Sequence, residues 1–292
     1  MTTTALDTPV FLRPTTLAEA LAAKAAHPDA APITGGTDIM VELNFDVRRP
    51  AVLLDLSEVA ELRTWERDGD RVRVGAAVTY TRIVHELADE LPGLALAART
   101  VGSPQIRNRG TVGGNLGAAS PAGDCHPPLL ATGADVEVAG VRGTRLVPVA
   151  EFFTGVKRTA LAADELVTAV LVPRKRGPQQ FAKIGTRNAM VIAVCSFALA
   201  LDTSARTVGT GIGSAGPTPL RAPQAQELAA AELPWESRDD IDVRLATRFG
   251  ELVAAAARPI DDVRGTAAYR RLALAVLARR CLRWAWQEYR CA

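Results

Sequence analysis

Residues 33–38, ITGGTD, and residues 110–115, GTVGGN, are two double-glycine segments from distant parts of the chain. Each follows a stretch that reads as apolar or extended, and each ends in a small polar residue, Asp38 or Asn115. Glycine allows positive φ angles and leaves room for a ligand beside the backbone, so consecutive N–H groups can point into one anion-binding concavity. Two such concavities would embrace a two-phosphate group, and the pattern therefore predicts a bound dinucleotide.

Other glycine-rich patterns in the chain do not change this interpretation. One Gly-Gly pair alone is most often a tight turn, and it is the repeat of the context that favours a ligand site. Residues 211–216, GIGSAG, fit the G-x-G-x-x-G pattern, but Pro217 and Pro219 block the helix that a Rossmann site requires. We interpret this stretch as a strand end and a turn. The sequence contains no G-x-x-x-x-G-K-[ST] segment, which excludes a P-loop.

Size and charge narrow the class of protein. The chain has 292 residues, 48% of them apolar, and its 34 basic and 32 acidic residues give a formal net charge of +2. That length predicts two or three subdomains, and the charge balance favours neither nucleic acid nor an anionic membrane as a partner. No apolar run reaches the roughly 18 residues of a membrane span, and Met1–Val10 lacks the pattern of a secretory signal. We expect a cytoplasmic protein.

Cysteine and histidine give no metal site. The four cysteines, Cys125, Cys195, Cys281 and Cys291, form no C-x-x-C pair and match no zinc or iron–sulfur spacing, which favours reduced thiols partly in the core. His126 follows Cys125 directly, but two possible ligands do not make a site, and we favour loop packing. If the protein receives electrons from an iron–sulfur centre, that centre would therefore lie on another polypeptide.

Hydrophobic periodicity predicts an α+β chain. Residues 10–56 are expected to form a small β–α–β–α–β unit, with a capping box at Thr16 and Glu19. Strands are then expected over 71–78, 135–138, 146–148 and 166–172, and helices over 79–87, 91–101 and 129–132. After a boundary near Gly177 and Pro178, strands over 181–184, 191–201 and 206–213 should form a mostly antiparallel sheet, followed by helices over 223–231, 241–256 and 267–289. We predict subdomains over 1–56, 57–175 and 176–292.

Two charged residues each leave two interpretations open. Asp124, at the head of a short helix, is either an ordinary N-cap or a carboxylate that accepts hydrogen bonds from sugar hydroxyls. Lys183 lies in an alternating strand; such a lysine is usually solvated, but it and Arg187 could instead point at a bound cofactor.

With these features in place, the chain resembles the FAD-binding (medium) subunits of molybdenum hydroxylases, the family of xanthine dehydrogenase and aerobic carbon monoxide dehydrogenase. The most specific match is residues 109–124, RGTVGGNLGAASPAGD, where sixteen residues keep type and spacing. Further matches lie at 33–40, 152–155, 164–173 and 181–187. The resemblance implies a PCMH-type FAD-binding domain of two α/β subdomains, followed by a C-terminal subdomain of antiparallel sheet plus helices.

The resemblance also implies a set of FAD contacts. Main-chain amides would bind the pyrophosphate, so no basic motif is needed. The first phosphate segment would be Pro32, Ile33, Thr34, Gly35, Gly36, Thr37, Asp38 and Ile39, and the second Gly110, Thr111, Gly113, Gly114 and Asn115. Val101, Gly102 and Ile106 would border the flavin, Ala118 and Asp124 would reach the ribityl or ribose region, and Val167 and Lys183 would lie near the isoalloxazine ring.

In this family the medium subunit passes electrons and does not oxidise the organic substrate. The resemblance implies a large partner with a molybdenum–pterin cofactor, a small partner with [2Fe–2S] clusters, and an external acceptor such as NAD, a quinone or oxygen. We expect an oxidoreductase subunit of a heterotrimer, doubled in the family's manner to a dimer of heterotrimers, with no acid–base catalytic side chain on this chain. A free-standing PCMH-fold flavin oxidoreductase acting on a small molecule and a flavin-free binding module are the alternatives.

Overall fold

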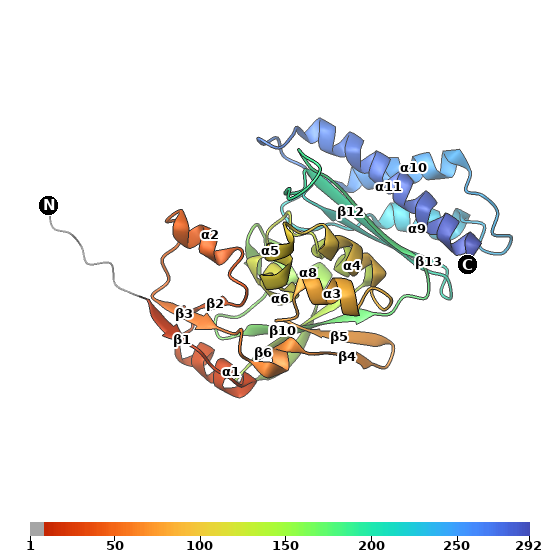
Figure 1. The fold of residues 1–292 in the computed structure, drawn as a ribbon. Coiled ribbons are helices and arrows are strands. Elements are labelled where there is room, and N and C mark those ends of the chain that lie inside the picture. The colour runs from red at the N-terminus through yellow and green to blue at the C-terminus, as the bar shows by residue number, and fades with distance from the viewer. Residues whose placement is uncertain (1–8) are drawn as a thin grey trace.

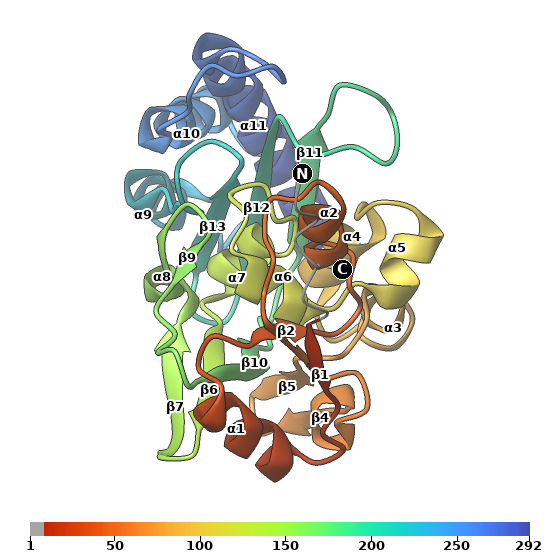
Figure 2. The ribbon, with the colours of Figure 1, turned by 90° about the vertical axis from the view of Figure 1, so that its left-hand side faces the viewer.

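The computed structural model describes residues 9–292. The first eight residues of the expected N-terminal subdomain, and most of the stretch inspected for a secretory signal, lie outside the described residues. Three main sheets follow one another along the described chain, each accompanied by helices, and Figure 1 colours these sheet-and-helix units from red at the N-terminal one to blue at the C-terminal helices. Figure 2 shows from a second side that the helices of the middle unit lie between the N-terminal strands and the C-terminal helices. Mixed helix and sheet confirm the α+β class.

The N-terminal unit is the predicted β–α–β–α–β arrangement. Its elements are β1 (Val10–Leu12), α1 (Leu17–Ala26), β2 (Ala31–Ile33), α2 (Ile39–Asn44) and β3 (Val52–Asp55). The three strands are parallel, in the order β1-β3-β2. Helix α1 begins with the predicted capping box, in which Thr16 and Glu19 satisfy each other's backbone N–H groups. The carboxyl end of β2 leads directly into the first glycine segment.

The middle unit is an antiparallel sheet with helices. Its strands run in the order β4-β5-β10-β6-β7. They are β4 (Trp65–Asp68), β5 (Arg71–Gly75), β6 (Asp135–Gly140), β7 (Gly143–Pro148) and β10 (Leu166–Pro173). The helices are α3 (Tyr80–Glu86), α4 (Pro92–Arg99), α5 (Pro104–Arg109), α6 (Val112–Ala118), α7 (His126–Thr132) and α8 (Val149–Phe152), with a 3-10 helix, η1 (Ala60–Arg63), and a small hairpin of β8 (Phe153–Gly155) and β9 (Arg158–Thr159).

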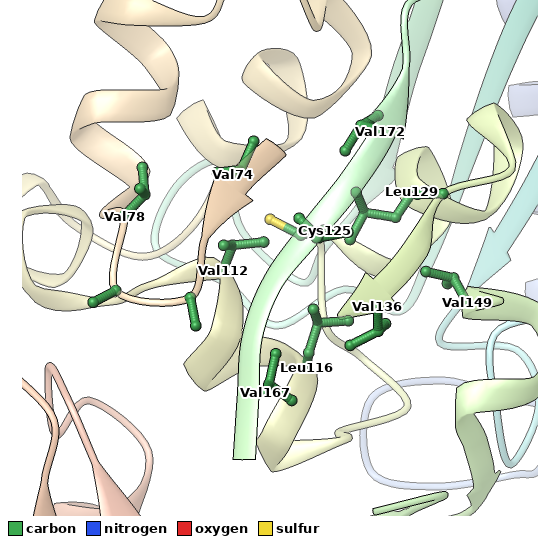
Figure 3. Close-up of a cluster of buried hydrophobic side chains, with 14 of the residues drawn as sticks. Val74, Val78, Val112, Leu116, Cys125, Leu129, Val136, Val149, Val167 and Val172 are labelled. Atoms are coloured by element: carbon green, nitrogen blue, oxygen red, sulfur yellow. The ribbon is translucent and has the colours of Figure 1, made fainter. Parts of the chain in front are cut away.

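The core of the middle unit fixes helix α6 against the sheet. Val112 and Leu116, one helical turn apart on α6, are fully buried and belong to the same hydrophobic cluster as Val136 of β6 and Val167 of β10. Figure 3 shows these side chains converging from the helix and the strands. The helix that carries the second glycine pair is therefore held by apolar packing on its inner side.

The C-terminal unit is an antiparallel sheet buried on both faces. Strands β11 (Gln179–Ile184), β12 (Cys195–Asp202) and β13 (Thr207–Gly213) are followed by α9 (Pro223–Glu232), α10 (Val243–Ala256) and α11 (Ala267–Cys291). Phe197 and Leu199 of β12 pack in the cluster that contains these helices. Ala198 and Ala200, on the opposite face, pack in a cluster with Ala131 of α7. The sheet thus joins the C-terminal helices to the middle unit.

Three glycines of β13 serve this joint: Gly209, and Gly211 and Gly213 from the G-x-G-x-x-G stretch. A Cβ on Gly209 would lie 1.8 Å from the carbonyl oxygen of Ala131, and one on Gly211 would lie 2.0 Å from that of Pro127. A Cβ on Gly213 would lie 2.4 Å from Ser196 Oγ and 2.7 Å from Cγ of the Pro127 ring. Strand β13 ends at Gly213 and no helix follows within the motif, in agreement with the prediction of a strand end and turn.

Several sequence-based expectations are wrong in detail. The second glycine segment was expected to form an open concavity of backbone amides, but Gly113 and Gly114 lie in the first turn of helix α6. Residues 191–194 precede the strand that was expected to begin at 191, since β12 begins at Cys195. Helix α5, strand β4 and the hairpin β8–β9 were not predicted. Within residues 9–292, no helix combines the length and apolar character needed to cross a membrane.

Candidate cofactor site

A cleft of about 890 Å³ lies where the three units meet. Its walls come from the end of β2 and the start of α2, from α6 and the loop after it, from residues 161–167 ahead of and within β10, and from residues 190–192 between β11 and β12. This volume lies within the range of about 300–1,000 Å³ that small-molecule and cofactor sites occupy.

The first glycine segment contributes backbone N–H groups without a protein acceptor to this cleft. Gly36 has a φ of 75°, a left-handed conformation that favours glycine, and it turns the chain from β2 toward α2. Within the described chain, the N–H groups of residues 35–38 donate to no protein acceptor. Consecutive free amides in such a turn form a concavity that suits an anion.

The two glycine segments touch each other. A Cβ on Gly35 would lie 1.8 Å from the carbonyl oxygen of Arg109, so only glycine allows this approach of the two backbones. Next to this contact, the hydroxyl oxygens of Thr34 and Thr111 are 3.5 Å apart. The segments that were expected to lie on either side of one ligand therefore form one continuous wall.

The second segment differs from the amide nest that we expected. The N–H groups of Val112 and Gly113 donate to the carbonyl oxygens of Val78 and Ala76, at 3.2 and 2.9 Å. The N–H of Gly114 donates to the Thr111 hydroxyl at 3.0 Å, which makes Thr111 the N-cap of α6. Gly113 is required for close packing, because its Cβ would lie 2.4 Å from that of Ala76. The second segment therefore lines the cleft without offering free amides at Val112 to Gly114, and the free amides come from the first segment.

Asp124 and Lys183 form a buried ion pair. Lys183 Nζ lies 2.6 Å from Asp124 Oδ2, and the two side chains are only 9% and 10% exposed. Cys125, not Asp124, occupies the N-cap position of α7, so the N-cap interpretation of Asp124 is wrong. The solvated interpretation of Lys183 is also wrong. Asp124 Oδ1 is buried without a partner in the described chain, and burial raises the pKa of Asp124 although Lys183 opposes that effect.

His126 packs within the loop that leads to α7. Its fully buried ring lies 4.4 Å from the Phe153 ring, and Nε2 donates to the Asn115 carbonyl oxygen at 3.1 Å, since a carbonyl can only accept. Burial lowers the pKa of His126 to about 4, with the Asn115 carbonyl opposing the shift. The residue is therefore neutral at physiological pH. These contacts give His126 a packing role, as the sequence predicted.

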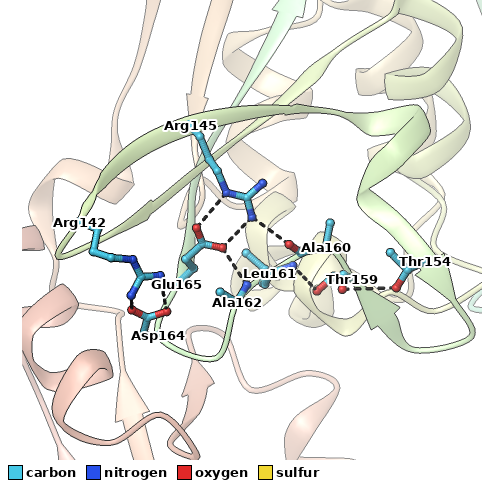
Figure 4. Close-up of polar contacts among 9 residues, drawn as sticks. All are labelled: Arg142, Arg145, Thr154, Thr159, Ala160, Leu161, Ala162, Asp164 and Glu165. Atoms are coloured by element: carbon cyan, nitrogen blue, oxygen red, sulfur yellow. Dashed lines mark hydrogen bonds and ion pairs between the residues drawn. The ribbon is translucent and has the colours of Figure 1, made fainter.

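A set of ion pairs braces the loop at one end of the cleft. Arg145 of β7 donates to Glu165 at 2.9 and 2.7 Å and to the Ala160 carbonyl at 2.8 Å, and Glu165 in turn accepts from the N–H of Ala162 at 2.7 Å. Arg145 holds the pKa of Glu165 below its usual value. Figure 4 shows this arrangement and the neighbouring pair of Arg142 and Asp164. Hydrogen bonds thus fix the backbone of residues 160–165.

The structure brings nearly all predicted contact residues together. All of them except Lys183 line the cleft; the others are Pro32 to Ile39, Val101, Gly102, Ile106, Gly110, Thr111, Gly113, Gly114, Asn115, Ala118, Asp124 and Val167. Sequence reasoning missed Lys24, Arg48 and Lys157, which also line it. Lys24 is 7% exposed and donates to the carbonyl oxygens of Pro28 and Ala30, and nothing in its alanine-rich helix marks it as a lining residue.

Comparison with known proteins gives two family matches that together span most of the chain. Residues 5–175 match the family described as "FAD binding domain in molybdopterin dehydrogenase". Residues 180–285 match the family described as "CO dehydrogenase flavoprotein C-terminal domain".

Individual relatives agree with these matches. The chain is 35% identical over 243 residues to the nicotinate dehydrogenase FAD-subunit of Eubacterium barkeri, which covers 78% of this chain and 82% of that protein. It is 31% identical over 279 residues to the nicotine 6-hydroxylase medium subunit of Paenarthrobacter nicotinovorans, covering 93% and 95%. Among solved structures, a chain of the Cu,Mo-CO dehydrogenase matches with a TM-score of 0.87 and 27% identity, covering 96% of this chain and 98% of that chain.

Proposed function

The chain belongs to the family of FAD-binding subunits of molybdopterin dehydrogenases, and from this premise we propose that it passes electrons from the [2Fe–2S] clusters of a partner through FAD to an external acceptor. It is an oxidoreductase subunit with FAD as its cofactor. The acceptor would be NAD, a quinone or oxygen.

One observation carries the proposal: the free amides of residues 35–38 lie in the wall of the cleft, directly beside the second glycine segment. These amides would hold the diphosphate of FAD, and a side chain at Gly35 would obstruct that wall. The Thr37 hydroxyl would add a side-chain hydrogen bond to the diphosphate, and the Asp38 carboxylate would accept one from a donor group of the cofactor. The remaining predicted lining residues would surround the ribityl chain and the isoalloxazine ring. When bound, FAD supplies the redox chemistry, and the chain's own residues bind and orient it.

The partners follow from the relatives. Several are named as FAD subunits or medium chains, and these names imply further chains in their complexes. For this chain we propose a large molybdenum-cofactor subunit and a small [2Fe–2S] subunit, assembled as a dimer of heterotrimers. We also propose the division into subdomains at residues 56 and 175, because each resulting segment holds a sheet of its own.

Purification of the native complex tests the proposal. We expect a yellow preparation with a flavin spectrum, molybdenum and iron by metal analysis, and two further co-purifying chains. Addition of the organic substrate should bleach the flavin band, and addition of the acceptor should restore it. A yellow chain without partners or metals would favour a free-standing flavin oxidoreductase, and a preparation free of flavin would refute the assignment.

A further inference from the structure

Lys183 is a buried cation whose hydrogen-bonding capacity is fully used by protein. Its Nζ donates to Asp124 Oδ2 at 2.6 Å, to the Thr100 carbonyl oxygen at 2.9 Å and to the Val191 carbonyl oxygen at 3.2 Å. A lysine ammonium has three N–H groups, so these three acceptors account for all of them. Lys183 also does not line the cleft.

Each of the three acceptors belongs to a different wall of the cleft. Thr100 ends helix α4 and immediately precedes Val101 and Gly102, both lining residues. Asp124 is itself a lining residue. Val191 belongs to the segment between β11 and β12 that contributes residues 190–192 to the cleft. Lys183 lies on β11, in the C-terminal unit, and two of its acceptors lie in the middle unit.

We propose that Lys183 is a positioning residue that fastens these three walls to one another, and that it acts on the cofactor through them and not by direct contact. The inference rests on the proposed function, because the cleft that Lys183 holds together is the proposed FAD site. A buried charge is tolerated when it is paired and fully hydrogen-bonded, and here the pairing joins segments that are far apart in sequence. All three contacts are made by the chain's own residues, so we expect them to hold the walls together whether or not FAD is bound.

Limited proteolysis of the flavin-free protein distinguishes this role from direct contact. Arg187 is exposed in the same segment as Val191 and offers a trypsin site there. In Lys183→Met the Val191 anchor is lost, and we expect cleavage after Arg187 to accelerate about tenfold, which corresponds to about 1.4 kcal/mol and to the net value of about one hydrogen bond. FAD affinity should fall at least as much. A lysine that only touches the cofactor would lower FAD affinity and leave cleavage of the flavin-free chain unchanged, which would overturn the proposal.

Lys175 provides a matched control. It pairs with Asp202 at 3.5 Å in the same part of the chain, but neither residue lines the cleft. Lys175→Met should leave both cleavage at Arg187 and FAD affinity unchanged; equal effects in the two variants would contradict a specific role for Lys183.

A double variant guards against misfolding of the single one. Lys183→Met leaves the Asp124 carboxylate buried and unpaired, whereas Lys183→Met with Asp124→Leu removes both charges and should fold more readily. The double variant must show the same faster cleavage at Arg187, and wild-type cleavage in it would overturn the proposal. Wild-type protein that binds no FAD at all would refute the proposed function, while the proteolysis comparison would still decide the role of Lys183.

Discussion

Substitution of Gly35 by alanine tests the contact between the two glycine segments. The added Cβ would lie 1.8 Å from the Arg109 carbonyl oxygen, and contacts under 3.0 Å essentially never occur for a real Cβ. The two backbones must therefore separate by about 1.2 Å. Neither group is the flexible end of a side chain, so the movement falls on the backbone that carries the free amides of residues 35–38.

The expected cost to FAD binding follows from the hydrogen bonds at risk. A hydrogen bond to a charged group contributes about 1.5–3 kcal/mol, so losing one that is worth about 2 kcal/mol weakens binding about thirtyfold. Fluorescence titration of the flavin-free protein with FAD would measure the change in Kd, and thermal unfolding would show that the variant is folded.

Gly250→Ala is a control of similar steric severity. A Cβ on Gly250 would lie 2.4 Å from the carbonyl oxygen of Ala275, at the contact of α10 and α11 and away from the cleft. We expect this variant to lose thermal stability and to keep the wild-type Kd for FAD. The reasoning is refuted if folded Gly35→Ala protein binds FAD as tightly as the wild type does.

Three further outcomes are expected. Burial lowers the pKa of His126 to about 4, against about 6.5 in the unfolded chain, so the unfolded state binds more protons below pH 7. The free energy of unfolding, measured by urea titration, should therefore fall by about 2 kcal/mol between pH 7 and pH 5. His126→Phe should remove this part of the pH dependence, and an unchanged pH dependence would contradict the prediction. Asp262→Asn removes the carboxylate from Arg270, which is only 3% exposed, and should cost about 3 kcal/mol in chemical denaturation, whereas a loss below about 1 kcal/mol would show that the buried guanidinium is stable without its carboxylate. Thr111→Val removes the N-cap of α6 and should cost about 1 kcal/mol in the same assay, with no loss expected if the Gly114 N–H finds another acceptor.

The elements that sequence reasoning located are those with local signals. The capping box at Thr16 and Glu19 marked the start of α1, and the alternation of valines marked β5. The shared context of the two glycine segments placed both at one ligand site, although they were expected on opposite sides of the ligand and not in direct contact. In each case the information lay within a few residues of the element concerned.

The misread features depend on contacts between distant residues. Gly113 and Gly114 were interpreted as part of an anion-binding concavity because glycine allows positive φ angles, yet they lie in α6, where glycine is needed at 113 to pack against Ala76. Lys183 was open to a solvated interpretation because its burial depends on Asp124 and on backbone carbonyls far away in the chain. Local sequence propensity does not depend on partners that are distant in the chain. The helical conformation at Gly113 and the burial of Lys183 therefore result from tertiary packing and could not be predicted from their sequence neighbours.

The close backbone contact between α7 and β13 limits how these two elements can move relative to each other. Because the carbonyl groups of Ala131 and Pro127 lie where side chains of Gly209 and Gly211 would otherwise stand, neither surface can slide or tilt without a collision of backbone atoms. The contact between the last sheet and the rest of the molecule is therefore rigid, and we expect no hinge motion there. Spin labels attached on either side of it should report a single narrow separation, with and without a docked partner.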